Sequence, residues 1–502
     1  MRHTRNHPLS AIATLVLMSP FLYSGTVLAQ PKPWSSFAEN AQHVALSGNG
    51  TQNLNQIHWQ TPVDLHPQLS GDELLIHYGS PLITAANTVI VPVKTGTAGG
   101  FRVDAHSGTD GSLLWSLPTN YVLPPHDWTP VFGPVLSRKP RLYIPAAGGT
   151  VIVRETPDSA TGTEILLAFY GLGNYHADPA TYNANVVINT PLTSDPSGNI
   201  YFGFMVLGST PVPLQSGIAR ISASGQGSWV SVAAAANDSS MTKVAHNCAP
   251  ALSWDSKTLY ITVSNGSAGY LVSLDSTTLA PLAHIRLIDP KSGADAWVSD
   301  NSSASPTTGP DGDVYYGVLE SPFPENHDRG WLLHYDATLT QTKTPGAFGW
   351  DDTASLVPAS LVASYTGTSP YLLMTKYNNY ANVGGNGDNR IAVVDPHAAE
   401  KDPITGVTTM RVVLGIEGPT PNPPLAGVKE WCINSAAVDA VTKSVLANSE
   451  DGKLYRWDLT TNTLSQAVVL SSGLGEAYTS TVIGVDGTVY AINDAILFAV
   501  GN

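Results

Sequence analysis

The chain has 502 residues, of which 13% are charged, and its formal net charge at pH 7 is −15. This length permits either several average domains or one large all-β unit. An acidic balance without a cluster of Lys and Arg excludes the usual nucleic-acid-binding classes, because neutralising phosphates requires basic groups.

The first 29 residues have the pattern of a signal peptide. Arg2 and Arg5 precede an apolar run over about residues 9–28, and Ala29 precedes the expected cleavage point. A membrane anchor is the alternative, but Pro20 and polar residues interrupt the run. No cysteine follows for lipid attachment, and no later stretch is long and apolar enough to span a bilayer. We therefore expect a secreted or periplasmic protein with no membrane span and no lipid anchor.

One short pattern recurs along the rest of the chain. An apolar strand, a turn signal such as Asp-Gly or Ser-Gly, and a second strand with a bulky residue at a fixed place recur about every 45 to 75 residues. The bulky residues are Ile90, Tyr143, Tyr201, Tyr260, Tyr315, Tyr371, Leu446 and Tyr490. A pattern of this period is typical of propellers.

A second recurring feature is an Asp that closes a later strand of the repeat. It occurs at Asp104, Asp275, Asp336, Asp395 and Asp458. An Asp side chain in this position can accept hydrogen bonds from backbone N–H groups two residues on and fix a tight turn. We interpret these residues as turn formers and not as catalytic groups.

Each repeat therefore contains four antiparallel strands, and eight repeats predict an all-β fold, an eight-bladed β-propeller. The last repeat has room for only three strands, whereas "IHWQTP" around Trp59 has the spacing of the fourth strand found at Trp115. We expect this N-terminal strand to complete the last blade and close the ring, because closure removes an open sheet edge. Residues 30–502 are thus predicted to be one domain.

These features resemble the PQQ-like repeat β-propeller superfamily, which includes quinoprotein alcohol dehydrogenases and BamB-like assembly factors. The resemblance rests on the "DGxVY" turns, the strand-closing Asp, and "WSSFAENAQHVALS" followed by "IHWQTP", and it is strongest to uncharacterised secreted bacterial members. It implies a fold more than an activity. The BamB-like members carry a lipoprotein cysteine after the signal, which this chain lacks.

The two cysteines bear on the cofactor that the resemblance suggests. The quinoproteins carry adjacent cysteines that pack against PQQ, whereas Cys248 and Cys432 lie in different repeats. No cofactor is therefore predicted, and PQQ with Ca²⁺ is kept only as an alternative. A disulfide between the two cysteines and two buried thiols both stay open.

Polar and aromatic residues precede the innermost strand of every repeat. Innermost strands begin at one rim of a propeller channel, so we expect these residues to gather at the channel mouth and form a ligand site. The candidates are His77, Tyr78, His126, Asp127, Trp128, Asn189, His246, Asn247, Asp300, Asn301, Asp351, Asp352, Trp431, Asn434, Glu476 and Tyr478. The alternative for each is a structural role, as a polar cap for loop backbone or an aromatic wedge between blades.

Two functions remain open. The preferred one is a monomeric scaffold that binds a small polar molecule, a carbohydrate or a protein, because the chain has no nucleophile elbow, Walker loop or zinc motif. The other is a lyase, hydrolase or dehydrogenase acting on a polar or carbohydrate substrate, with His126 beside Asp127, or His246 opposite Glu476, as acid–base groups. No metal site is predicted, and the glycine-rich segment 381–389 is expected to be a surface loop.

Overall fold

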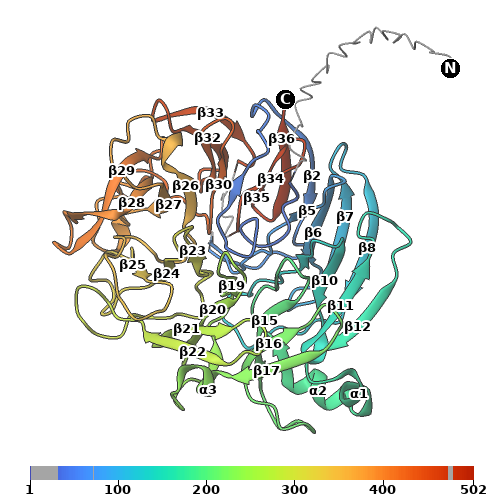
Figure 1. Ribbon diagram of the computed structural model, residues 1–502. Coiled ribbons are helices and arrows are strands. Elements are labelled where there is room, and N and C mark those ends of the chain that lie inside the picture. Colours follow the sequence, from blue (N-terminus) through green and yellow to red (C-terminus); the bar gives the residue numbers. More distant parts are fainter. Residues whose placement is uncertain (2–31, 72, 473–478) are drawn as a thin grey trace. The chain divides into compact units, whose positions relative to one another are not determined.

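The computed structural model describes Met1 and residues 32–71, 73–472 and 479–502. The predicted signal peptide and two candidate residues, Glu476 and Tyr478, lie outside these ranges. Residues 31–502 form one compact unit. Apart from one short hairpin, its strands form eight small β-sheets, called blades 1 to 8 in chain order and visible around the ring in Figure 1.

Blades 1 to 4 each have four strand positions, which follow one another from the inside outward. Blade 1 contains β5 (Leu82–Ile83), β6 (Thr88–Lys94), β7 (Phe101–Ser107) and β8 (Leu113–Thr119). Blade 2 contains β9 (Val135–Leu136), β10 (Arg141–Pro145), β11 (Thr150–Glu155) and β12 (Glu164–Ala168). Blade 3 contains β13 (Val186–Ile188) and β14 (Thr193–Ser194), which both pair with β15 (Ile200–Val206), then β16 (Gly217–Ile221) and β17 (Gly227–Ser231). Blade 4 contains β18 (Lys243–Val244) and β19 (Ala251–Leu252), which both pair with β20 (Thr258–Ser264), then β21 (Gly269–Asp275) and β22 (Pro281–Arg286).

Blades 5 to 8 vary more in strand number. Blade 5 contains β23 (Thr307–Thr308), β24 (Val314–Val318) and β25 (Trp331–Tyr335). Blade 6 contains β26 (Ser355–Pro358), β27 (Tyr371–Tyr377), β28 (Arg390–Lys401) and β29 (Thr408–Glu417). Blade 7 contains β1 (Leu46–Ser47), β30 (Ala437–Asp439), β31 (Ser444–Asn448), β32 (Lys453–Asp458) and β33 (Thr463–Val469). Blade 8 contains β34 (Val482–Ile483), β35 (Val489–Asn493), β36 (Ile496–Gly501) and β2 (Gln56–Pro62).

The eight-bladed propeller predicted from the sequence is confirmed, with differences in detail. Blade 5 has three strands and not four, because the segment after β25 makes only the isolated bridges Leu332–Gly346 and Tyr335–Thr342. Pro345 within that segment has no N–H to donate to a ladder. In blade 8, β2 pairs antiparallel with β36 and is the outermost strand.

Short elements occupy the connections. A hairpin of β3 (Leu69–Ser70) and β4 (Glu73–Leu74) precedes blade 1. The helices are α1 (Leu172–Ala177), α2 (Pro179–Asn185) and α3 (Val232–Ala236), and the 3₁₀ turns are η1 (Ala147–Gly149), η2 (Ala359–Leu361) and η3 (Ala381–Val383). None of the helices in the described ranges is long and apolar enough to cross a membrane.

The recurring bulky residue lies on the second strand of each blade, and several of the tyrosines at this position bind a neighbouring blade. The buried Tyr201 hydroxyl donates to the carbonyl of Ser276 at 3.0 Å, and Tyr260 donates to a carbonyl of blade 5 at 2.7 Å. The hydroxyls of Tyr315 and Tyr371 lie 2.6 Å apart. The tyrosine thus fills the apolar space between sheets and also satisfies a polar group of the next blade.

Most of the strand-closing aspartates form turns as predicted. Asp275 accepts backbone hydrogen bonds two and three residues on, at 3.0 and 2.8 Å, and Asp458 repeats this geometry. Asp336 and Asp395 also accept backbone N–H bonds from the residues that follow them. Asp104 differs, because its carboxylate binds Arg102 and a serine hydroxyl of the adjacent strand. Its role is still structural.

Residues 34–47, which we call the strap, cross the end of the channel where the innermost strands finish. The strap carbonyls of residues 34, 35, 41, 42, 44 and 45 accept hydrogen bonds from the innermost strands of blades 1, 2, 4, 5, 6 and 7. Its last two residues form β1, which runs parallel to β30. Within the strap, the imidazole of His43 is fully buried, and this burial lowers its pKa to about 4. The strap therefore ties six blades together at one end of the channel.

Candidate functional site

Two kinds of loop meet at the end of the channel opposite the strap. In an up-and-down blade, the loop into the innermost strand and the loop between the second and third strands lie at the same end. These loops of blades 1, 2, 5, 6 and 7 line a cavity of about 500 Å³, which we call the mouth cavity. Its size lies within the range of small-molecule sites.

Five of the predicted site residues line the mouth cavity: His77, Trp128, Asn301, Asp351 and Trp431. The imidazole of His77 packs against the Trp128 ring with centroids 5.4 Å apart, and burial lowers the pKa of His77. Asp351 adopts a left-handed backbone conformation, with φ of 52°, and one of its carboxylate oxygens accepts hydrogen bonds from the N–H and hydroxyl of Ser303.

Four other predicted residues do not line the mouth cavity, and they form buried hydrogen bonds between blades. Asn189 donates to the carbonyl of Val244 at 2.8 Å and lies 3.1 Å from Nδ1 of His246. Asn247 accepts from a backbone N–H before blade 2 at 2.8 Å and donates to a carbonyl before blade 5 at 3.0 Å. Asn434 donates to the carbonyl of the next residue, Ser303, at 2.9 Å. The amide side chains of these asparagines form hydrogen bonds with backbone groups of the loops, so these residues have the structural role given above as the alternative.

The remaining described candidates are dispersed. His126 and Asp127 are exposed beside the cavity, and Asp300 forms an ion pair with Lys243. The buried Tyr78 has its hydroxyl 3.5 Å from Asp64. The structure thus does not bring His126, His246 and Asp351 together as lining residues of one cavity.

Asp352 is buried next to the mouth cavity without lining it. Its carboxylate accepts a hydrogen bond from the Thr375 hydroxyl. Burial raises the pKa of Asp352 to about 7, against the opposing attraction of Lys376. Asp351 and Asp352 therefore have different environments although they are adjacent in the chain.

The mouth cavity contains acidic residues that the sequence interpretation did not select. Asp328 comes from the β24–β25 loop, Glu450 from the β31–β32 loop, and Glu73 from β4. Glu430 directly precedes Trp431. The sequence repeat marks the residues before innermost strands and carries no information on the loops between second and third strands. The position of Glu430 directly before the predicted site residue Trp431 is the one feature of the sequence that indicates an acidic site here.

Two of these carboxyl groups titrate near neutral pH. Burial, together with the negative charges of Glu320 and Glu430, raises the pKa of Asp328 to about 7. Burial also raises the pKa of Glu430 to about 7, against the attraction of Lys376. Both side chains can therefore bind or release a proton at neutral pH.

Lys376 is the buried cation of the mouth cavity. It lies at the end of β27, its residue is 3% exposed, and its side chain lines the cavity. Among the described residues, no carboxylate oxygen lies within 4.0 Å of its ammonium and no side-chain or backbone group accepts a hydrogen bond from it. The nitrogen lies 5.8 Å from the centroid of the Phe348 ring. Because Lys376 lines the cavity, its ammonium is available to an acceptor group of a bound molecule.

The aromatic and thiol groups complete the lining. Trp431 is fully buried, and its backbone is held by the Asn378 side chain at 3.2 and 3.3 Å. Trp350 and Tyr380 also line the cavity. Cys432 follows Trp431, while Cys248 is buried in blade 4, and neither cysteine forms a disulfide. The open question of a disulfide is thus answered in favour of two unbridged cysteines.

The glycine-rich segment 381–389 packs on the loop that precedes blade 7. The carbonyl of Gly387 accepts a hydrogen bond from the N–H of Val428 at 3.0 Å, and Asn389 donates to the Val428 carbonyl at 2.8 Å. Gly387 has φ of 76°, and a Cβ there would lie 2.0 Å from the carbonyl oxygen of Ala426. This close backbone approach requires glycine and positions the loop that lines the cavity.

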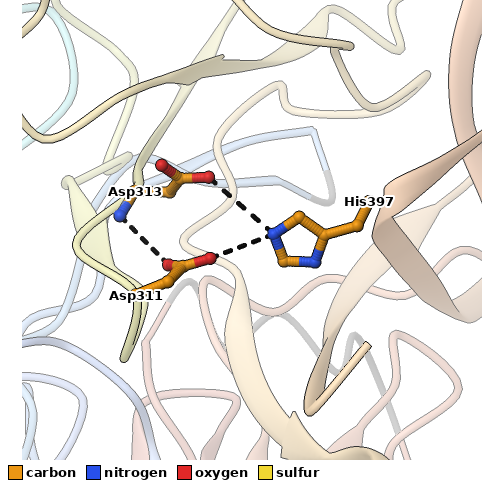
Figure 2. Close-up of side chains that lie close together, drawn as sticks. All are labelled: Asp311, Asp313 and His397. Atoms are coloured by element: carbon orange, nitrogen blue, oxygen red, sulfur yellow. Dashed lines mark hydrogen bonds and ion pairs between the residues drawn. The ribbon is translucent and has the colours of Figure 1, made fainter. Parts of the chain in front are cut away.

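A separate cluster is formed by Asp311 and Asp313 of the β23–β24 connection and by His397 of β28 (Figure 2). His397 Nε2 is 3.0 Å from an Asp311 oxygen and 3.9 Å from an Asp313 oxygen. These groups are of the kind that bind divalent cations. However, Lys343 already contacts both oxygens of Asp313 at 2.5 and 2.6 Å, and Tyr371 donates to Asp311 at 2.8 Å. Both carboxylates of the cluster therefore already have partners within the protein.

Comparisons with known proteins support the fold. No protein-family model and no curated protein matches the sequence. Among solved structures, a europium-containing methanol dehydrogenase is 12% identical with a TM-score of 0.54, covering 92% of this chain and 89% of that one. The quinohemoprotein alcohol dehydrogenase from Comamonas testosteroni is 13% identical with a TM-score of 0.54, covering 94% and 77%. BamB from Moraxella catarrhalis is 13% identical with a TM-score of 0.48, covering 89% and 99%. This chain shares the propeller fold of the two dehydrogenases.

Proposed function

We propose that this protein is a binding propeller that holds a small polar molecule in the mouth cavity. The observation that carries this proposal is Lys376, a buried ammonium that lines the cavity without an acceptor among the described residues. The cavity lining is mostly polar, with several carboxylates beside aromatic walls, and polar groups that converge next to aromatic rings can orient a small polar ligand. The predicted signal peptide supports action outside the cytoplasm.

A ligand screen by thermal shift tests the proposal. A true ligand should raise the Tm of the wild-type chain and lose most of this effect with Lys376→Met, because the variant removes the ammonium but keeps the stem. Lys257→Met is the matched control, since Lys257 is a strongly exposed lysine on another blade. Ligands that stabilise Lys376→Met as well as the wild type would contradict the proposal.

Acid–base catalysis on a polar or carbohydrate substrate is the second candidate. Asp328 and Glu430 favour it, because both line one cavity and burial raises the pKa of each to about 7. A catalytic acid or base works best with a pKa near the working pH. Turnover of a ligand found in the screen, abolished by Asp328→Asn and Glu430→Gln, would establish this activity.

We do not propose PQQ as a cofactor. PQQ carries three carboxylates, and in the mouth cavity it would face more carboxylates than lysines. The adjacent cysteine pair of the quinoproteins is also missing, because Cys248 and Cys432 lie in blades 4 and 7. The residues present therefore do not fit this group.

A further inference from the structure

The mouth cavity combines an excess of negative charge with one buried positive charge that has no acceptor among the described residues. Carboxylates outnumber ammonium groups in the lining. The acidic residues are Glu73, Asp328, Asp351, Glu430 and Glu450, and the basic residues are Lys376 and Lys429. A ligand that complements this lining must satisfy both signs.

The ammonium of Lys376 attracts the surrounding carboxyl groups of Asp352 and Glu430, but it donates no hydrogen bond among the described residues, so a ligand can supply a direct acceptor. The two nearby aspartates are held by their own surroundings: Asp351 accepts from Ser303, and Asp352 accepts from Thr375. Neither has an oxygen within 4.0 Å of the Lys376 nitrogen. A ligand carboxylate in the cavity would supply the missing acceptor in a poorly solvated place, where a charge-assisted hydrogen bond is strong.

The acidic residues Asp328 and Glu430 would be stabilised by a cation. Asp328 and Glu430 repel each other, and no lysine or arginine nitrogen lies within 4.0 Å of either carboxylate among the described residues. An ammonium group between them would relieve this repulsion. Trp128 and Trp350 line the same cavity and can stabilise a cation through their ring faces.

We propose that the ligand of the mouth cavity is an amino acid, whose carboxylate binds Lys376 and whose ammonium group binds the acidic residues. This inference rests on the proposed binding function and specifies its ligand class. Because carboxylates are in excess, a basic amino acid with a second ammonium group matches the lining best. The cavity volume of about 500 Å³ accommodates such a molecule with its side chain extended.

Matched ligands test the inference on the chain lacking its predicted signal peptide. L-Lysine carries both charges, cadaverine is lysine without the carboxylate, and glucose is a neutral polyol. By isothermal titration calorimetry, L-lysine should bind the wild type at least about tenfold more tightly than cadaverine, as expected for one charge-assisted contact. In Lys376→Met this advantage should disappear, while Lys257→Met should behave as the wild type.

Proton release provides a second measurement. An ammonium group beside Asp328 and Glu430 lowers the pKa of both carboxyls, which are raised to about 7 in the free cavity. Binding of L-lysine at pH 7 should therefore release protons, and the binding heat should differ between phosphate and Tris buffers. Glu430→Gln should reduce this difference, because it removes one of the two groups.

The outcomes separate the inference from the proposed function. Cadaverine binding as tightly as L-lysine in the wild type would overturn the assignment of the carboxylate to Lys376. Binding of glucose without binding of L-lysine would overturn the inference and leave the binding function intact. Failure of L-lysine together with every compound of the thermal-shift screen would overturn both.

Discussion

Asp352 links the electrostatics of the mouth cavity to the stability of the fold. Burial raises its pKa from 3.8 to about 7, so the folded chain holds a proton that the unfolded chain releases over this interval. A pKa difference of one corresponds to about 1.4 kcal/mol, and the free energy of unfolding should therefore fall by up to about 4 kcal/mol between pH 4 and pH 7. Above pH 7 this contribution should stay constant.

Asp352→Asn removes the ionisation and keeps an oxygen that accepts from the Thr375 hydroxyl. The variant should match the wild type near pH 4, where the aspartic acid is neutral in the fold, and should be more stable by up to about 4 kcal/mol at pH 8. Urea unfolding followed by tryptophan fluorescence at pH 4, 6 and 8 measures this difference. Asp127→Asn is the control, because Asp127 is exposed near the same cavity. A variant equally changed at pH 4 and pH 8 would refute the reasoning.

Three further predictions concern the parts that hold the cavity. Deleting residues 32–47 should lower the Tm strongly in scanning calorimetry, since six blades lose backbone hydrogen bonds to the strap; an unchanged Tm would contradict its structural role. Gly387→Ala should cost about 1–3 kcal/mol in urea unfolding, more than Gly406→Ala, because both have positive φ but only Gly387 faces a backbone oxygen. Adding Ca²⁺ or Zn²⁺ should leave the Tm of the wild type unchanged. The Tm of Lys343→Met should rise with either metal, because this variant frees the Asp313 carboxylate. A rise in the wild-type Tm that His397→Ala abolishes would contradict this prediction and would indicate a cation site.

The ring of blades could be predicted because each repeat solves the same local problem. A tyrosine on the second strand fills the space between neighbouring sheets, and an aspartate after the third strand satisfies turn N–H groups. The same packing and turn requirements recur from blade to blade, so the same residue types recur at an interval that is visible in the sequence. Blade 5 is the exception and lacks the fourth strand, because Pro345 and Gly346 disfavour a regular strand there.

The candidate site was predictable only in part, for the same reason. The repeat placed residues before innermost strands at the correct end of the channel, and His77, Trp128 and Asp351 line the mouth cavity. At equivalent positions in other blades, Asn189 and Asn247 satisfy buried backbone groups instead. Whether a polar side chain faces the cavity or the neighbouring blade depends on backbone turns that the interval does not encode.

The residues that carry the proposed chemistry lie where the repeat places no constraint. Asp328 comes from the connection between β24 and β25, and Lys376 lies at the end of β27, directly before the corresponding connection of blade 6; these connections differ in length and sequence from blade to blade. Such loops are free to vary because the strap and the interblade tyrosines hold the ring from elsewhere. The buried Lys376, Asp351 and Asp352 lower stability where their charges are desolvated, and a scaffold stabilised independently of them can retain these groups. Two measurements can be compared: the stability gained by Asp352→Asn at pH 8 and the ligand affinity lost by Lys376→Met. Together they show how much stability the fold loses by keeping charged groups at this site.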